Sequence, residues 1–271
     1  MKKYFPALII ALALTLPALS VTLYVPGQYP TIQAAVNAAN AGDVVMVAPG
    51  VYYEHVEILT SIELIGMDMY NTIIDAEGVD KCVYINASDT FGKINGFTLR
   101  NSGLDYTGGT ANCAICIKTY GTGNWEISNN IIKENLSVGI LSFGNGVIHH
   151  NVFENNGFGG GFARAIFASS YSTNTIAQND FKDNVTAIYA HSATVSVVIQ
   201  NNIIIENQVG IAPANNTYTI AYNDVWNNGT NYSGCSPGIG DISQDPLCIG
   251  GNPYCYYLTA TSPCIDAGHL V

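Results

Sequence analysis

The clearest pattern in the chain is a repeat of apolar and Asn positions that extends from Trp125 to Asn228. Each unit starts with Asn, carries a large apolar residue two places later, and has a second Asn five places after the first. The leading Asn residues are Asn130, Asn151, Asn179, Asn202 and Asn223, which gives spacings of 21, 28, 23 and 21 residues. A repeat length in the twenties is typical of stacked structural units, so the pattern predicts a solenoid.

Three apolar columns run through this repeat. The first contains Ile127, Ile148, Ile176, Ile199 and Ile220. The second contains Ile132, Phe153, Phe181, Ile204 and Val225. The third contains Ile115, Ile140, Ile166, Ile188 and Ile211. Three short strands per turn that face one core predict an all-β protein, a parallel β-helix. Asn tolerates a left-handed backbone, so we expect the leading Asn residues at a corner, with their amides bonded along the stack.

Ahead of the repeat, residues 29–40 carry the best helix signal in the chain. Thr31 suits the N-cap position, Gly42 is expected to end the helix, and apolar residues recur between them at helical spacing. The apolar run 44–47 follows at once. A short amphipathic helix before a stack of strands predicts a cap over the first open turn.

Further apolar runs predict strands between this helix and the repeat, at 51–58, 61–65, 72–74, 82–85 and 93–99. Gly96 and Asn101 fit the places of the leading and trailing Asn in an earlier unit. The Gly-rich residues 101–111 are expected to form a loop that bulges from the stack.

The first 20 residues resemble a secretory signal peptide. Lys2 and Lys3 precede an apolar run, and Ala18-Leu19-Ser20 is a small-residue cleavage site. An uncleaved membrane anchor is the alternative, but prolines interrupt the apolar run. We therefore expect a secreted or cell-surface protein with four parts. These are a signal peptide (1–20), a cap with a short helix (21–42), the β-helix (43–228) and a Cys-containing tail (229–271).

The chain is acidic, with 9 Lys and Arg against 20 Asp and Glu, and a net charge of −11. Removal of the signal peptide would take away two lysines and no acid. Such a surface repels nucleic acid and anionic lipid, which excludes both as partners, and it repels polyanionic sugars unless a divalent cation bridges them. We expect a monomer without membrane contact after cleavage.

The seven cysteines fall into two groups of interest. Four lie in the tail, where an exported protein can form disulfides, and their pairing stays open among three schemes: Cys235, Cys248, Cys255 and Cys264. Cys113 and Cys116 have redox or zinc spacing. In an alternating strand, however, they should point to opposite faces, which argues against a metal site.

The repeat resembles the right-handed parallel β-helix superfamily, which includes pectate lyases, polygalacturonases and pectin methylesterases. The opening is similar too, in residues 29–36 (YPTIQAAV), 47–54 (VAPGVYYE) and 72–78 (TIIDAEG). The ending, residues 240–247 and 262–268, is similar to that of many secreted bacterial members. The resemblance implies a right-handed coil, single-stranded and with three strands per turn, and a sugar-binding groove on the outward face of one strand column.

On that outward face, one strand column carries an aromatic strip with polar neighbours. Phe143, Phe167 and Tyr189, with Ser169, form a candidate platform for pyranose rings, and Lys118, Arg164 and His191 lie near it: these seven are the candidate site residues. The alternative is that the loop 157–163 or the tail covers the strip.

Catalysis is a separate question, because glycoside hydrolysis needs two carboxylates and this face has none. The catalytic motifs of the polygalacturonases and methylesterases are also missing. A polysaccharide lyase is the better enzymatic alternative, with Lys118, Arg164 and His191 as base and cations and Tyr189 as an acid. Calcium would be a cofactor only for that lyase; otherwise we expect no cofactor and no metal.

Two further polar columns have structural explanations. Lys133, Glu154 and Lys182 alternate in sign along one outward column, as in a solvated ladder. Asp180 and Asp224 lie two turns, roughly 10 Å, apart, with no apolar neighbour to raise either pKa. The first hypothesis is therefore a β-helix that binds an extracellular polysaccharide along the aromatic strip. A lyase or hydrolase, and a non-catalytic adhesive scaffold, are the alternatives.

Overall fold

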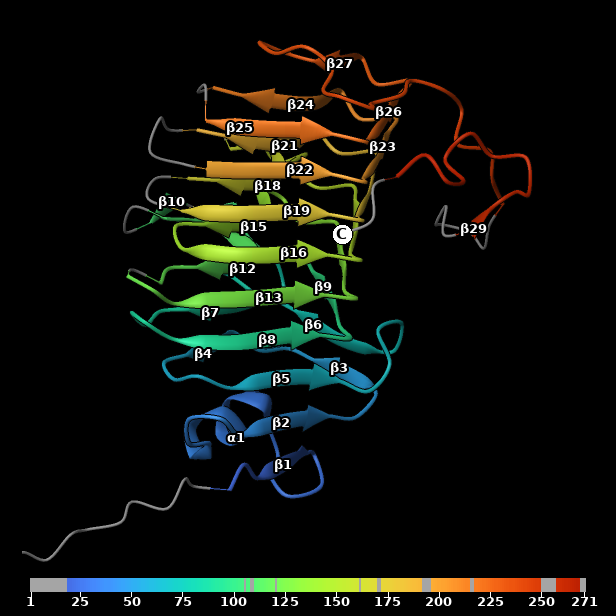
Figure 1. Cartoon of the computed structure of the whole chain (residues 1–271). Helices are drawn as coiled ribbons and strands as arrows, with labels where there is room; N and C mark the ends of the chain where they lie inside the picture. Colours follow the sequence, from blue (N-terminus) through green and yellow to red (C-terminus); the bar gives the residue numbers. More distant parts are fainter. Residues whose placement is uncertain are drawn as a thin grey trace, which may run out of the picture.

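The computed structural model describes residues 19–104, 106–107, 110–119, 121–160, 162–169, 172–191, 196–214, 217–249 and 257–268. The expected signal peptide lies outside these residues, except for its last two positions. In the described part, the chain winds into a coil of three parallel sheets with one short helix at the N-terminal end (Figure 1). The expected parallel β-helix with three strands per turn is thereby confirmed.

Each turn of the coil adds one strand to each sheet, here named A, B and C in chain order. Sheet A contains β1 (Thr22–Val25), β2 (Val44–Val47), β5 (Glu63–Gly66), β8 (Phe91–Asn95), β13 (Asn124–Ser128), β16 (Asn145–His149), β19 (Thr173–Ala177), β22 (Ser196–Gln200) and β25 (Tyr218–Ala221). Sheet B contains β3 (Gly50–Tyr52), β6 (Thr72–Asp75), β9 (Thr98–Arg100), β14 (Ile131–Lys133), β17 (Val152–Glu154), β20 (Asp180–Lys182), β23 (Ile203–Ile205) and β26 (Asp224–Trp226). Sheet C contains β4 (Val56–Ile58), β7 (Val83–Ile85), β12 (Cys113–Ile117), β15 (Val138–Ser142), β18 (Arg164–Ala168), β21 (Thr186–Ala190), β24 (Val209–Pro213) and β27 (Thr230–Tyr232).

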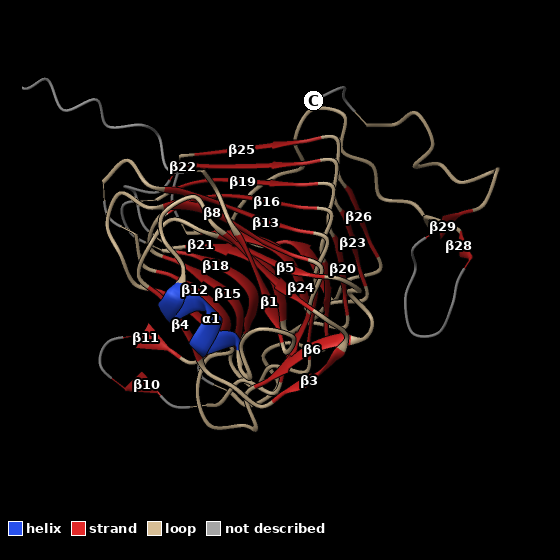
Figure 2. Ribbon diagram, turned by 90° about the horizontal axis from the view of Figure 1, so that it is seen from below, coloured by secondary structure: helices blue, strands red, loops and turns tan. Residues whose placement is uncertain are grey.

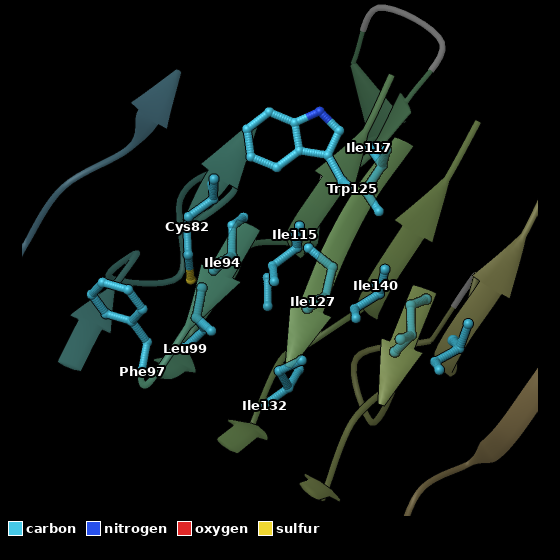
Figure 3. Packing of buried hydrophobic residues seen from close by; sticks show 14 of the residues in the cluster. Cys82, Ile94, Phe97, Leu99, Ile115, Ile117, Trp125, Ile127, Ile132 and Ile140 are labelled. Carbon is cyan, nitrogen blue, oxygen red and sulfur yellow. The ribbon is translucent and has the colours of Figure 1, made fainter. Parts of the chain in front are cut away.

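The three apolar columns predicted from the repeat are the core of the coil. Ile127, Ile132 and Ile115 come from sheets A, B and C, and all three are fully buried. Figure 3 shows them converging from three sides, with Trp125 filling the interior nearby. Because each Ile pairs in register with the apolar residue of the next turn, the core is continuous along the axis.

Two ladders of buried Asn side chains hold the corners of successive turns. In the ladder between sheets A and B, each Nδ2 donates to Oδ1 one turn on, over 2.9–3.1 Å, through Asn130, Asn151, Asn179, Asn202 and Asn223. The ladder between sheets B and C runs in the same way through Asn135, Asn156, Asn184, Asn207 and Asn228. Each amide also donates to a backbone carbonyl of the previous turn, as from Asn151 to Ile127. The ladders therefore satisfy backbone groups that the corners leave unpaired.

The left-handed residue of each corner precedes the ladder Asn, so its expected place at the Asn itself is wrong. His150, Gln178 and Asn201 have φ of 53°, 55° and 55° immediately before the ladder residue. The Asn is free of this strain, which leaves its side chain to point inward along the ladder. Varied residues occupy the left-handed position because it faces outward. Each of them accepts a conformational cost of about 1–2 kcal/mol.

Phe97 and Ser102 take the two ladder positions one turn before Asn130 and Asn135, so the alignment that placed Gly96 and Asn101 there was shifted by one residue. The backbone N–H of Phe97 donates to Asn130, and that of Ser102 to Asn135. Gly96 and Asn101 are instead the left-handed residues.

Two of the predicted apolar runs each contain a short corner between two strands. The run 51–58 divides into β3 and β4, and 93–99 into β8 and β9. The expected loop 101–111 leaves the coil and carries a small hairpin of β10 (Tyr106–Thr107) and β11 (Thr110–Ala111).

The N-terminal end of the coil is covered by helix α1 (Ile32–Ala38), as Figure 2 shows from below. Thr31 is the N-cap and accepts a hydrogen bond from the N–H of Ala34, as expected. The carboxylate of Glu54 accepts two further bonds, from the N–H groups of Ile32 and Gln33. The helix ends at Ala38, earlier than Gly42.

The C-terminal part of the coil continues past residue 228. Strand β27 pairs with β24, and Ile239 and Ile242 bridge to Ala221 and Asp224. The tail then swings outward on the side of sheet B and carries β28 (Cys248–Ile249) and β29 (Tyr257–Leu258), which form an antiparallel pair to one side of the coil (Figure 1). In the part of the chain that the structure describes, no helix has both the length and the apolar character needed to cross a lipid bilayer.

We predict that Asn179→Ala lowers the free energy of unfolding by roughly 3 kcal/mol, because several buried partners lose their hydrogen bonds to the Asn179 side chain at once. The control is Asn129→Gly at an exposed corner with φ of 53°, where Gly is tolerated. Denaturant unfolding measures both. Equal effects of the two substitutions would mean that the ladder does not stabilise the coil.

Candidate functional site

The outward face of sheet C carries the aromatic strip predicted from the sequence. The strip residues are in register on successive turns, so that Leu141 pairs with Phe167 and Phe167 with Tyr189. Phe143, Ser169 and His191 follow the ends of β15, β18 and β21 on the same face. Stacking at about 4.8 Å per turn therefore brings these side chains together.

Arg164 lies at the centre of a cluster of rings on this face. Its guanidinium carbon is 4.2 Å from the ring centroid of Tyr189, 5.2 Å from that of Phe167 and 5.8 Å from that of Phe162. The ring of His191 also lies beside those of Tyr189 and Phe167, with centroid-to-centroid distances of 6.1 Å and 5.6 Å. We call Phe162, Arg164, Phe167, Tyr189 and His191 the Arg164 cluster.

The electrostatics of the cluster depend on partial burial. Burial lowers the pKa of Arg164, and its neighbour Tyr189 opposes this shift. The Nε atom of Arg164 is buried and has no hydrogen-bond partner among the described residues. The guanidinium is thus held mainly by ring faces and by Tyr189, at a cost in hydration.

The strip is covered in part by its flanking loop. Phe162, from the loop before β18, stacks on Phe167 at 5.8 Å with 16° between the ring planes. Phe167 is consequently only 6% exposed, and Ser169 is equally buried. Tyr189 is partly exposed and His191 exposed, so these two and Phe162 present the accessible surface. The sequence offered no signal for Phe162, because a loop residue has no column.

The remaining predicted residues lie farther down the same face. Phe143 is partly buried against the cluster that contains Cys116 and Leu141, and Tyr84 packs against the same cluster. Lys118 precedes Phe143, Ser169 and His191 in one column, which places it three turns, about 14 Å, from His191. The structure therefore brings Arg164, Tyr189 and His191 together but leaves Lys118 apart.

Cys113 and Cys116 point to the same outward face, which corrects the expectation of opposite faces. Both are fully buried in the cluster beneath the strip. The reason is that Ala114 and Ile115 both face the core, which breaks the alternation of β12. Burial, reinforced by Cys116, raises the pKa of Cys113. Both thiols are free.

The returning part of the tail meets the coil at sheet B, away from the Arg164 cluster. Leu258, Cys264 and Gly268 meet Asn201 and Tyr222 around a cavity of about 260 Å³. Of the tail cysteines, Cys235 and Cys264 are free, and Cys255 lies outside the described residues. Each of the three expected schemes pairs both Cys235 and Cys264, so the expected stapling of the tail by all four cysteines is wrong.

The tail also changes the surroundings of two aspartates, so the expectation that nothing raises their pKa values is wrong. Burial raises the pKa of Asp180 to about 7. Asp224 is 3% exposed, and burial raises its pKa although Cys264 and Gln244 donate hydrogen bonds to it. Burial and Asp224 together raise the pKa of Cys264 to about 12. Asp180 and Asp224 do occupy one column, with Ile203 between them.

The charged column on sheet B differs from the solvated ladder predicted from the sequence, because Glu154 is only 7% exposed and burial raises its pKa. Lys133, Glu154 and Lys182 are in register on successive turns. The ion pairs of the two lysines, however, are to the corner residues Glu134, Asp183 and Glu206. In the described ranges, no three His, Cys, Asp or Glu side chains are grouped so that they can hold a metal ion.

Comparison with known proteins adds to this geometry. A family model described as the right handed beta helix region matches residues 81–242. The pectin methylesterase from Aspergillus niger is similar in structure, with a TM-score of 0.54 and 13% identity over 84% of each chain. The pectin methylesterase from carrot has a TM-score of 0.53 and 14% identity over 84% of this chain and 77% of that one. At such identities the likeness shows the fold alone. No curated protein matches the sequence.

The raised pKa of Asp180 predicts a pH dependence of stability. The Asp180 carboxyl keeps its proton in the folded state up to about pH 7, whereas in the unfolded chain it loses the proton near pH 4. The contribution of this protonated carboxyl to the free energy of unfolding is therefore fully present below about pH 4 and is lost as the pH rises through 7. When the pH is raised from about 4 to about 8, the stability of Asp180→Asn relative to the parent should therefore increase by about 1–4 kcal/mol.

Denaturant unfolding at the two pH values measures the gain. The control, Asp183→Asn, removes a partly exposed carboxylate from the next corner and should show the smaller change. An Asp180→Asn gain that is the same at both pH values would contradict the assignment.

Proposed function

Because the chain belongs to the right-handed β-helix family, we propose that it binds an extracellular polysaccharide along the outward face of sheet C. The Arg164 cluster is the observation that carries this proposal. It combines exposed ring surface with a cation and lies on a face flanked by loops on successive turns. The signal peptide expected from residues 1–20 supports an extracellular ligand.

The chemistry of the cluster suits a sugar better than an apolar ligand. Pyranose rings have apolar faces that stack on aromatic rings, and their hydroxyl groups need hydrogen-bond partners at the edge. Tyr189 and Phe162 offer the ring faces. Arg164 and His191 offer polar groups beside them, and the exposed ring of His191 is the more accessible of the two. A repeating ligand can follow the coil axis because the face repeats along it.

A lyase is the second candidate, favoured by the closeness of Arg164, Tyr189 and His191. Such a reaction removes a proton beside a carboxylate, for which His191 would be the base, Tyr189 the acid and Arg164 the stabilising cation. The outward positions of β15, β18, β21 and β24 carry no Asp or Glu, so hydrolysis by a carboxylate pair is disfavoured there.

We predict that Tyr189→Ala weakens binding about tenfold to whichever polysaccharide retards the parent protein in affinity gel electrophoresis. Loss of the ring removes the stacking face and the support of Arg164. The matched control is Tyr53→Ala, which removes an exposed ring from the N-terminal turns. Thermal unfolding checks that both variants are folded. Equal binding by Tyr189→Ala and the control would remove this face as the site.

The same polysaccharides test the second candidate. Incubation with the protein would produce unsaturated sugars with ultraviolet absorbance if the face were a lyase site. Absorbance that rises with the parent and disappears in His191→Ala would assign the lyase in place of simple binding.

A further inference from the structure

An open groove lies on a different face, over the first half of sheet A. Its volume is about 440 Å³, and it crosses β5, β8 and β13. Its polar and aromatic lining consists mainly of Glu63, Phe91, Lys93, Asn124 and Glu126. No motif in the sequence pointed to this groove, because the turns that contribute its residues lie more than 20 positions apart in the chain. The parallel register brings them together.

Three charged residues form one column along the groove. Glu63 pairs in register with Lys93, and Lys93 with Glu126. The two glutamates are therefore two turns, roughly 10 Å, apart at the backbone, with Lys93 on the turn between them. Counted together, these side chains carry a net charge of −1.

Glu126 is held in place by three partners on one oxygen. Its Oε1 accepts hydrogen bonds from Lys93 Nζ at 2.8 Å and Ser128 Oγ at 2.8 Å, and His149 Nε2 lies 3.2 Å away. Burial acts to raise the pKa of Glu126, but the bonds from Lys93 and Ser128 outweigh it and leave the pKa lowered. No described residue donates to Oε2. One oxygen of a fixed, ionised carboxylate is thus available to a ligand.

Other groups in the groove also have unused hydrogen-bonding capacity. The Glu63 carboxylate and the Asn124 side-chain amide make no hydrogen bond to any described residue, and both are exposed. The Phe91 ring is 52% exposed at the edge of the groove. The groove therefore combines a ring face, an amide and an unpaired carboxylate.

The charge of the groove selects among ligand classes. Lys93 already pairs with Glu126, which leaves the Glu63 charge without a partner. A uronate would meet two carboxylates, of which only Glu126 is paired with Lys93. A ligand with an ammonium group would instead pair with Glu63 and contact the Phe91 ring face. The net charge of −11 also attracts a cationic ligand to the chain.

We propose that the groove over β5, β8 and β13 binds a saccharide that carries free primary amines, such as a chain of non-acetylated amino sugars. Phe91 stacks on a sugar ring, Glu63 and Glu126 Oε2 accept from ammonium and hydroxyl groups, and Asn124 bonds a neighbouring hydroxyl. This site is on another sheet from the Arg164 cluster and does not depend on it.

Calorimetric titration of the full chain with short glucosamine oligomers tests the proposal. Fully N-acetylated oligomers of the same length are the comparison ligand. We expect the amine form to bind at least about tenfold more tightly, because acetylation removes the charge. Equal binding of the two forms would overturn the proposal.

Substitutions locate the site. Glu63→Gln is expected to weaken glucosamine binding by about threefold to tenfold, and Phe91→Ala by a similar factor. The matched control is Glu77→Gln, which removes one exposed carboxylate outside the groove. An equal loss in Glu63→Gln and Glu77→Gln would indicate attraction to the overall charge and overturn the proposal.

Tyr189→Ala separates this site from the one on sheet C. It should leave glucosamine binding unchanged, even where it abolishes binding of a polysaccharide to the Arg164 cluster. Loss of glucosamine binding in Tyr189→Ala with retention in Phe91→Ala would place the amine ligand on sheet C and overturn the groove assignment.

Discussion

The corners of the coil depend on the two ladders of buried Asn side chains, and the rest of the structure depends on those corners. The chain of a β-helix must bend sharply between one sheet and the next, and each corner leaves backbone groups without a strand partner. The amide of Asn179 meets this demand by bonding to the turns on both sides of it. Because the same residue recurs on every turn between Asn130 and Asn223, the register of all three sheets is set from one corner to the next.

A fixed register frees the outward positions to vary, and the candidate sites lie where they vary. On sheet C, one outward column holds Leu141, Phe167 and Tyr189 on successive turns. On sheet A, another outward column holds Glu63, Lys93 and Glu126 on successive turns. In both places a binding surface is assembled from residues of different turns, and the stacking distance of about 4.8 Å sets its spacing. The core contributes rigidity and no chemistry.

The sequence predicted the columns well and the contacts between distant segments poorly. The strip of Phe167 and Tyr189 followed from the period alone, since alternation decides which residues face outward. Alternation failed at β12, where Ala114 and Ile115 both face the core and carry Cys113 and Cys116 to one side. It also gave no warning of Phe162, because a loop residue has no fixed phase.

What the sequence determined by itself was therefore everything that repeats: the three strands per turn, the buried Ile columns and the Asn corners, because periodic patterns specify local conformation and burial together. Only the tertiary structure decided what depends on one segment meeting another. The tail returns to Asp224 from 40 residues later and encloses it. The groove between Phe91 and Glu126 exists because strands of successive turns lie side by side. Such contacts arise from the path of the chain in space, and no local pattern encodes them.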